Sequence, residues 1–178
     1  ERFSKMLARS EDAQPPKVFQ LTNHVVICGC GRVGRTLGEV LENRGFTRLV
    51  IDEDPKVIER LKADGVPCIY GDASNRDILS RAALDKAKVM VITIQDPIAT
   101  ELTVRNARES NPKLDIVARV HFDHQVESLR KLGVAEIVRP EFEAGLEMVR
   151  HTLHRFGLPG VEIQYIISVL RHGETPEE

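Results

Sequence analysis

The 178-residue sequence predicts an α/β fold, with a doubly wound, parallel, six-stranded sheet and helices on both faces. Three observations predict it. Short β-branched apolar segments alternate with amphipathic segments from about residue 23 to residue 157, a glycine-rich turn follows the first apolar segment, and an acidic residue ends the second. This alternation indicates a parallel sheet, because each strand must cross over through a helix to reach its parallel neighbour.

The composition excludes several other classes of protein. Apolar residues make up 42% of the chain and charged residues 29%, which is typical of a globular protein with a buried core. The 25 Lys and Arg residues face 27 Asp and Glu residues, so the net charge of -2 gives no positive field, and we expect no nucleic-acid partner. The longest apolar runs are too short to span a bilayer, and three cysteines in apolar surroundings suit a reducing compartment. We therefore expect a soluble, cytosolic segment.

Residues 1–22 are expected to be an arm and linker that precede the domain. Residues 1–11 are compatible with a helix, and Pro15 and Pro16 then stop it and stiffen the connection. The chain begins at Glu1 without an initiator methionine, so we expect a piece of a longer protein. The domain itself is expected over residues 23–157.

Each expected strand is short and apolar, as is typical of a strand buried on both faces. The six strands are predicted over residues 24–28, 48–52, 67–70, 88–93, 115–120 and 136–138.

Helical spacing of apolar residues predicts the helices between and after these strands. The first helix is expected to bury Val33, Leu37, Val40 and Leu41, and a longer last helix carries Leu146, Val149, Leu153 and Phe156 on one face. Residues 158–178 form a C-terminal extension, in which residues 161–170 fit either a helix or an edge strand and residues 171–178 are polar and expected to be loose.

The strongest motif is the run Val25 to Gly34 (VVICGCGRVG), an apolar strand that leads into G-x-G-x-x-G and an amphipathic helix. Gly29 permits the tight turn, Gly31 lets a phosphate approach the backbone, and Gly34 lets the helix pack against the strand. Free N–H groups at the start of this helix then face an anion. The predicted phosphate-binding residues are Gly29, Cys30, Gly31, Arg32, Val33 and Gly34.

An acidic residue stands where this motif requires one. Asp52 ends the second predicted strand, 18 residues after Gly34, and its carboxylate can accept hydrogen bonds from ribose hydroxyls. Glu53 and Asp54 follow directly and would repel a 2′-phosphate. The motif therefore predicts a Rossmann-like site for NAD(H) or an adenine nucleotide (AMP, ADP or ATP) rather than NADP.

Further residues reach the same crevice, because ligands of open α/β sheets bind at the carboxyl ends of the strands. The residues at these ends are Asp72 and Ala73, which could face the adenine, together with Thr93, Ile94, Gln95 and Arg119, of which Arg119 could meet phosphate.

Catalysis is not expected. Hydride transfer needs a second wall to hold a substrate, and the nucleotide fold uses most of the chain. The Tyr-x-x-x-Lys pair of single-domain dehydrogenases is missing, because Ser74 follows Tyr70 by four residues and Val169 follows Tyr165.

No metal site is expected either. His121 and His124 are three residues apart, as are His151 and His154, but no third ligand has matching spacing. We interpret these histidines as surface or interface residues. Cys28 and Cys30 are interpreted as residues of packing and backbone geometry rather than redox sensors.

Several ordered motifs together resemble one family. The runs HVVICGCGRVGRTLGEVL, VIDEDP, GDAS and IVARVHFDHQVESLRKLGVAEIVRPE closely resemble the regulator-of-potassium-conductance (RCK) domain, also called KTN or TrkA-N, over residues 23–157. Members of that family are cytosolic nucleotide sensors of potassium channels and cation/proton antiporters. The resemblance implies a switch and not a catalyst. It is greatest to the C-terminal regulatory part of a Kef-type monovalent cation:proton antiporter, with a membrane domain before Glu1 and this domain at the cytoplasmic face.

The resemblance also implies roles for residues. Asp52 and Glu53 would hold ribose, Asp72 and Ala73 would border adenine, and Glu141 matches an acidic position that reaches the partner's nucleotide phosphates through a cation in some relatives.

A homodimer is implied as well, with the last helix packed across the partner through Leu146, Val149, Leu153 and Phe156. Packing of these residues within one subunit is the alternative. A nucleotide that favours one dimer geometry would then shift the equilibrium, and residues 1–22 would transmit it to the membrane part. Three other functions stay open: a regulatory subunit of a potassium channel or Trk/Ktr-type uptake system, a fragment of an NAD-dependent oxidoreductase, and a structural assembly domain whose crevice is empty.

Overall fold

The structure is a computed structural model that describes residues 19–172. Six parallel strands form one sheet in the order β3-β2-β1-β4-β5-β6. The order reverses between β1 and β4, which creates the switch point where ligands of such sheets bind. The predicted doubly wound sheet is thus confirmed. The strands are β1 (Val25–Cys28), β2 (Arg48–Asp52), β3 (Cys68–Tyr70), β4 (Val89–Ile92), β5 (Asp115–Arg119) and β6 (Glu136–Val138).

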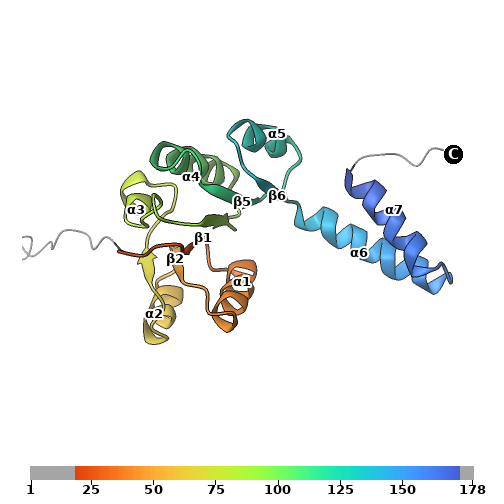
Figure 1. Cartoon of the computed structure of the whole chain (residues 1–178), viewed down its shortest axis with the longest axis horizontal. Helices are drawn as coiled ribbons and strands as arrows, with labels where there is room; N and C mark the ends of the chain where they lie inside the picture. The colour runs from red at the N-terminus through yellow and green to blue at the C-terminus, as the bar shows by residue number, and fades with distance from the viewer. Residues whose placement is uncertain (1–18, 173–178) are drawn as a thin grey trace, which may run out of the picture.

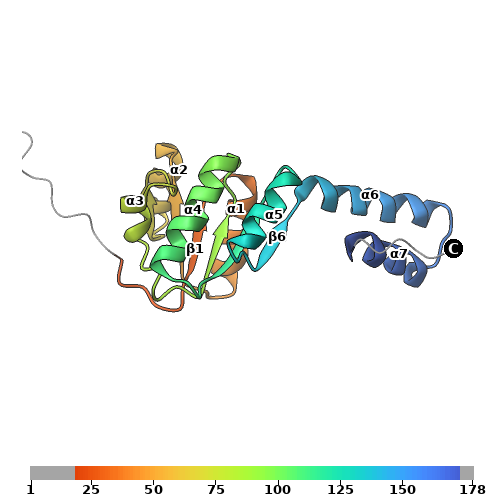
Figure 2. The same cartoon turned by 90° about the horizontal axis from the view of Figure 1, so that it is seen from above.

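Helices cover the two faces of the sheet unequally. Figure 1 shows α1 and α2 on one face and α3, α4 and α5 on the other. The remaining helices, α6 and α7, form a hairpin that extends away from the β6 edge, as Figure 2 also shows. The helices are α1 (Arg32–Asn43), α2 (Pro55–Ala63), α3 (Arg76–Ser80), α4 (Pro97–Ser110), α5 (His124–Lys131), α6 (Pro140–Arg155) and α7 (Gly160–His172).

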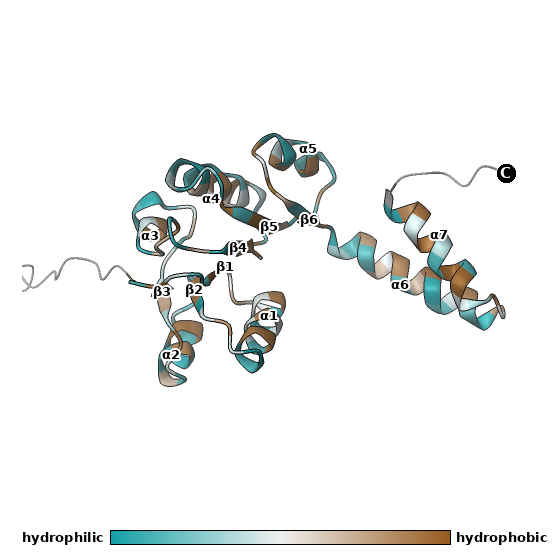
Figure 3. Ribbon diagram, in the orientation of Figure 1, coloured by the Kyte–Doolittle hydropathy of each residue, from teal (hydrophilic) through white to brown (hydrophobic). Residues whose placement is uncertain are grey.

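The main core lies between the sheet and the helices α3, α4 and α5. On β4 and β5 the residues that face these helices, such as Met90, Ile92 and Ile116, are fully buried. A smaller core lies on the opposite face, where Leu37 and Leu41 of α1 pack against the β1–β2 side of the sheet. Figure 3 shows the same pattern, with apolar strands in the middle layer and hydrophilic outer helix surfaces.

Half of the second sheet face lacks a covering helix among the described residues. Val91, Val117 and Glu136 lie in one row across β4, β5 and β6 by their register, and Arg119 pairs with Val138 in the next row. Val117 and Arg119 are only partly buried, and Val138 is 43% exposed. We call Val117, Arg119, Glu136 and Val138 the open sheet face. Parallel sheets are normally covered on both faces, so this surface is unusual.

The prediction that four apolar residues of the first helix are buried is correct for two of them. Leu37 and Leu41 pack on the sheet as expected, but Val33 and Val40 are 45% and 54% exposed. The reason is geometric: α1 crosses the sheet beside the open sheet face, so its outer side has nothing described to pack against. The sequence pattern recognised an apolar helix surface and could not tell which part of it the chain itself covers.

The C-terminal hairpin has a small core of its own. Leu146 of α6 packs with Ile163 and Ile167 of α7, and Leu153 joins them. The ambiguous segment 161–170 is therefore a helix. Of the residues predicted to form a dimer face on this helix, Leu146 and Leu153 pack within the chain itself, which was the alternative. Phe156 is 78% exposed.

Other predictions concern the ends of the chain. Arg171 belongs to α7 and pairs with Glu143 of α6 at 2.6 Å, so the predicted loose tail does not begin at residue 171. Residues 1–18 of the predicted arm and linker 1–22, which contain the expected helix and Pro15 and Pro16, lie outside the described residues, as do residues 173–178. The division into residues 1–22, 23–157 and 158–178 stays a prediction.

Candidate functional site

The glycine turn has the geometry that the motif demands. Gly29 has φ +93°, a left-handed conformation that side chains rarely adopt. A Cβ atom on Gly34 would collide with the carbonyl oxygen of Gly29, whereas a Cβ atom on Gly31 would meet nothing within 4 Å. The turn is therefore closed against its own helix at Gly34 and open toward the crevice at Gly31, where the motif places a phosphate.

Thr93 supports this turn from the neighbouring strand. It is buried at the end of β4, and its hydroxyl donates a hydrogen bond of 2.7 Å to the carbonyl oxygen of Gly29. The predicted residue thus helps to shape the turn and does not line the crevice.

Asp52 connects the turn to β2. Its carboxylate accepts hydrogen bonds from the backbone N–H of Cys30 at 2.5 Å and of Asp54 at 2.8 Å. These bonds fix the carboxylate at the mouth of the crevice, as a group that receives ribose hydroxyls requires. Asp54 in turn caps α2 through the backbone N–H of Lys56.

The start of α1 differs from the starts of α2, α3 and α4. Those helices have Asp54, Asn75 and Asp96 as N-caps, each accepting a hydrogen bond from a backbone N–H of the first turn. The N-cap of α1 is Gly31, which has no side chain, and the first turn contains no acidic residue. The N-terminal N–H groups and dipole of α1 are therefore left to an anion from outside the helix.

A crevice of about 520 Å³ lies at the carboxyl ends of β1 to β4. Its polar side carries the carboxylates of Asp52, Glu53 and Asp72, and its apolar side consists of Ile94 and residues of α4. Six predicted residues line it: Gly29, Asp52, Glu53, Asp72, Ala73 and Ile94. Asp72 is held by the backbone N–H and the hydroxyl of Ser74, at 2.7 and 2.6 Å.

The other predicted residues lie around this crevice and not in its lining. Cys30 and Gly34 line a smaller groove between α1 and α2, Gln95 is exposed after β4, and Arg119 ends β5 on the open sheet face. Arg32 and Val33 form the first turn of α1. These residues outside the lining would contact a ligand only through their backbone N–H groups, or if the ligand extended past the switch point.

Sequence reasoning missed the wall that α4 contributes. Asp96, Ile98, Ala99 and Leu102 line the crevice, and Ile98 is 72% exposed there. The only local signal was an Asp-Pro helix start after a buried strand. The apolar pair Ile98 and Leu102, four residues apart, resembled an ordinary core stripe.

The thiols are not reactive groups of this site. Burial raises the pKa of Cys28 to about 12, and burial is also the main cause that raises the pKa of Cys30, against three nearby arginines that lower it. Both thiols are free and protonated at neutral pH. This supports the interpretation of Cys28 and Cys30 as residues of packing and turn geometry.

A second group of polar residues lies beyond the crevice, where β5 and β6 meet α6. His121 follows β5, and its Nδ1 atom is 3.4 Å from Oε1 of Glu141 in the first turn of α6. The backbone N–H of Glu141 itself, then His121 and Arg119, lower the pKa of the Glu141 carboxyl. Nε of Arg119 and Nε2 of His121 are buried and have no hydrogen-bond partner.

The two histidine pairs lie in different surroundings. His121 precedes α5 and His124 begins it, so the two do not share a helix face; His124 stacks on Phe122 instead. His151 and His154 are exposed on α6. Within residues 19–172 no group of three His, Cys, Asp or Glu side chains is placed to hold a metal ion. The same part of the chain has no helix with the length and apolarity that a membrane span requires.

The sheet order, the glycine turn and the crevice define a Rossmann-like ligand-binding domain. The profile of the TrkA-N domain matches residues 25–140, most of the chain, and the chain therefore belongs to the TrkA-N family. The expected resemblance to RCK domains is confirmed.

Individual relatives agree with this assignment. The chain is 34% identical over 170 residues to the glutathione-regulated potassium-efflux system protein KefC of Salmonella typhimurium, matching 94% of this chain and 27% of KefC. The chain thus spans about a quarter of the length of that relative.

Solved structures show the same fold. The TrkA-N domain of the inner membrane protein ybaL of Escherichia coli is 32% identical, with a TM-score of 0.71 over 73% of this chain and 96% of that domain. The Kef C-terminal domain of Shewanella denitrificans, in an AMP-bound form, is 26% identical, with a TM-score of 0.75 over 85% of this chain and 92% of that one. The NAD-bound GsuK channel shares the fold at 19% identity and a TM-score of 0.68, over 83% of this chain and 27% of that one.

Proposed function

We propose that this chain is a non-catalytic sensor that binds an adenine nucleotide or NAD(H) and regulates a potassium or other cation:proton antiporter. One observation carries the proposal: an open glycine turn and an uncapped helix start adjoin a crevice with carboxylates on one side and an apolar wall on the other. A nucleotide has the matching three parts, which are a phosphate, a ribose and a flat base.

The nucleoside fits the crevice by chemistry. The carboxylate of Asp52 is fixed by two backbone N–H groups and faces where ribose hydroxyls would donate to it. Ile98 and Leu102 give an exposed apolar surface on which an adenine ring can stack. The lining contains four carboxylates and no cationic side chain, so a 2′-phosphate is disfavoured here. We therefore expect NAD to bind more tightly than NADP.

The phosphate fits the start of α1. Gly31 leaves open space, and the first-turn N–H groups of α1 have no side-chain cap. The Shewanella denitrificans relative is described with AMP, and the GsuK channel has been solved with NAD and with ADP. These ligands share the adenosine phosphate that the crevice and turn would hold.

Isothermal titration calorimetry tests binding directly. The purified chain is titrated with AMP, ADP, ATP, NAD, NADH and NADP, and compared with Asp52→Asn. We expect Asp52→Asn to lower the affinity for every nucleotide that binds about tenfold, because the ribose hydroxyls lose a charged hydrogen-bond acceptor. Asp85→Asn, an exposed residue before the amino end of β4, is the matched control and should change nothing. Absence of heat with all these nucleotides at millimolar concentration would contradict the proposal.

The antiporter role rests on the relatives and needs the whole protein. KefC is described as a glutathione-regulated potassium-efflux protein, and this chain matches about a quarter of it. Transport by the full-length protein should change when a binding nucleotide is added on the side of this domain. The change should be lost in Asp52→Asn. Equal transport with and without ligand would rule out gating.

Assembly as a homodimer is the second part of this proposal. The open sheet face and the outer side of α1 leave Val138, Val33 and Val40 without cover, and the hairpin exposes Val161 and Tyr165 of α7. A hairpin with only three buried core residues is not stable by itself without further packing. A second copy provides both surfaces at once in a two-fold arrangement, the hairpin of each copy packing on the other.

Sedimentation velocity of the 178-residue chain measures the assembly. We expect a dimer at micromolar concentration, and mainly monomer for Val138→Lys, because a charge would then face the partner's apolar helices. Phe46→Lys removes a similarly exposed apolar side chain in the loop after α1 and is the control. A monomeric wild type, or a dimer that Val138→Lys leaves intact, would contradict this arrangement.

A further inference from the structure

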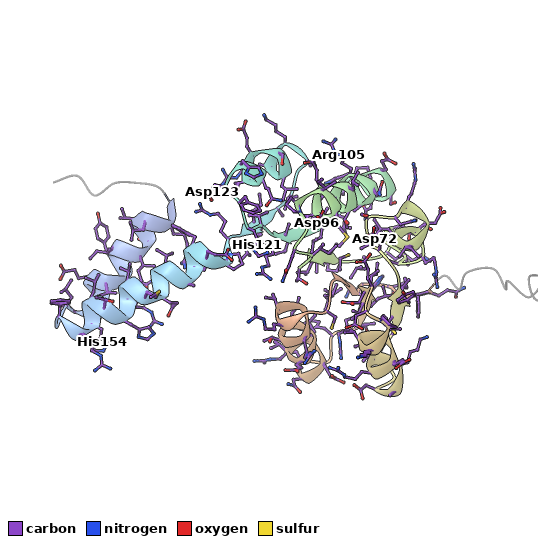
Figure 4. All side chains as sticks on the ribbon, turned by 180° about the vertical axis from the view of Figure 1, so that it is seen from behind. Asp72, Asp96, Arg105, His121, Asp123 and His154 are labelled. Carbon is purple, nitrogen blue, oxygen red and sulfur yellow. The ribbon has the colours of Figure 1, made fainter. Side chains whose placement is uncertain are left out.

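The unused polar group at the carboxyl end of β5 lies at the same edge of the sheet as the proposed phosphate position, two strands from β1. Ala118 pairs with Ile92, so Arg119 lies beside Thr93, the residue whose hydroxyl supports the glycine turn. His121 follows Arg119 by two residues, and the ladder continues through Val120, whose N–H donates to Val138. Arg119 and His121 therefore lie on the α1 side of the sheet. Figure 4 shows Asp72, Asp96 and His121 along one line between the helix layers.

Two donors in this group have no partner. Nε of Arg119 and Nε2 of His121 are buried without a hydrogen bond, although the His121 side chain as a whole is 22% exposed. Buried polar atoms without partners are rare and destabilising, so an acceptor that reaches both is favoured. The crevice at the ends of β1 to β4 is lined by carboxylates and by no cationic side chain, so Arg119 and His121 add hydrogen-bond donors for an anion at this edge of the sheet.

We propose that Arg119 and His121 form a second anion subsite, which takes a further phosphoryl group of a ligand whose first phosphate sits at the start of α1. The proposal rests on the proposed nucleotide binding. The end of β5 is two strands away from β1, about 9.6 Å at about 4.8 Å per strand, and the second phosphoryl group together with the long side chain of Arg119 spans this distance. AMP has a single phosphate and does not reach this subsite, whereas ADP and NAD do.

The hydrogen-bond chemistry of His121 adds a proton to this binding step. Nδ1 faces the carboxylate of Glu141 and must carry a hydrogen to donate to it. Nε2 must also carry a hydrogen to donate to a phosphate, and an imidazole has both hydrogens only as the cation. Binding of a second phosphoryl group therefore takes up a proton from solution when His121 is neutral beforehand.

The charged surroundings of His121 come from three elements. Glu141 of α6 lies 3.4 Å from Nδ1 of His121, and Arg119 of β5 and His121 both lower the pKa of the Glu141 carboxyl. Asp123, just before α5, is paired with Arg139 at 3.2 Å, and the preceding residue, Phe122, stacks with His124. Because Glu141 lies in the first turn of α6, the same proton strengthens the contact between the end of β5 and the base of the hairpin.

Calorimetry with AMP and ADP separates this subsite from the nucleoside site. We expect Arg119→Met and His121→Gln each to lower the affinity for ADP about tenfold, which is the effect of losing one charge-assisted hydrogen bond. Each should change the affinity for AMP less than about twofold. His124→Gln alters the neighbouring histidine that contacts Phe122 and should change neither ligand. A parallel loss for AMP and ADP, or no loss for ADP, would overturn the subsite while nucleotide binding stands.

Proton uptake is the readout that a purely structural role would not move. Titrations at pH 8 in two buffers with different ionisation enthalpies should show uptake of up to about one proton for ADP and none for AMP. His121→Gln should remove the uptake and keep AMP binding. The same uptake in His121→Gln overturns the role of His121. Absence of binding by either nucleotide to the wild type overturns the subsite together with the proposed function.

Discussion

The two halves of the sheet differ in how completely their faces are covered and in how completely their polar groups are hydrogen-bonded. Around β1, β2 and β3, both faces are covered, and the Asp52 carboxylate accepts hydrogen bonds from two backbone N–H groups. Around β4, β5 and β6, helices cover one face, Val138 is exposed on the other, and donors of Arg119 and His121 lack partners. The hairpin of α6 and α7 leaves from this second half.

On the proposed function, the first half would bind the ligand and the second half would respond to it. The polar groups of the first half are already hydrogen-bonded, so ligand binding there would need little rearrangement. The second half has unused apolar surface and unused hydrogen-bond donors, which a second copy and a ligand phosphate can satisfy. An equilibrium between assemblies shifts only when a ligand binds one better, and the second half is where such differential contacts are available.

The largest expected effect is the loss of stability caused by a substitution in the glycine turn of the first half. Gly34→Ala places a methyl group against the carbonyl oxygen of Gly29, in backbone that cannot move without opening β1 from α1. We expect a loss of more than about 3 kcal/mol in the free energy of unfolding, measured by urea denaturation. Gly38→Ala on the same helix meets only the Arg48 side chain at 3.5 Å and should cost little. Equal stability of the two variants would contradict the close packing at Gly34.

Arg108 offers the corresponding test in the second half. Its guanidinium donates to the carbonyl oxygens of Leu132 and Gly133, which precede β6, and of Leu114, which precedes β5, so it connects α4 to both loops. Arg108→Met should lower the free energy of unfolding by about 2 kcal/mol and leave nucleotide affinity unchanged. Arg105→Met, which removes only an exposed pair with Glu101, is the control. A large loss of affinity in Arg108→Met would show that the two halves are not separable.

Gly31→Ala separates binding from stability within the first half. The added methyl group meets no protein atom within 4 Å but occupies the space left for phosphate. We expect calorimetry to show about tenfold lower affinity for AMP and NAD. The free energy of unfolding should fall by at most about 1 kcal/mol, because alanine is a poorer N-cap than glycine. Unchanged affinity would place the phosphate away from the start of α1.

The smallest effect is an acid dependence of the hairpin. A hydrogen bond from Arg150 lowers the pKa of Glu147, so the folded form binds this proton less readily than the unfolded chain. The contribution of this pair is therefore present above the usual pKa of a glutamate and is lost as pH falls through the lowered value. Both side chains are exposed, so Glu147→Gln should only slightly flatten the decline of melting temperature below pH 5. A steeper decline would reverse the sign of this contribution.

Much of the fold was predictable from local patterns. The observed strands β2 and β6 have the predicted bounds, residues 48–52 and 136–138, and the other four differ by one residue at one or both ends. Gly29, Gly34 and Asp52 were assigned from spacing alone, because backbone conformation at a tight turn depends on neighbours in sequence. Residues 1–18 of the predicted arm and linker 1–22 are outside the described residues.

Less of the crevice was predictable. Ile98 and Leu102 come from a helix that begins 45 residues after Asp52, and nothing in their own neighbourhood distinguishes a ligand wall from a core stripe. Thr93 was expected in the crevice and instead supports the turn from behind. Such placements depend on which strands become neighbours.

The sequence by itself determined the parallel α/β class, the glycine turn and the acidic residue opposite it, since these follow from side-chain size and spacing along a short stretch of chain. The tertiary structure alone decided that Val33 and Val40 are exposed, that half of one sheet face is open, and that Arg119 and His121 lie beside Glu141. The physical reason is that burial and pairing are properties of contacts between distant segments, and one apolar pattern is compatible with a core, a ligand wall or an interface.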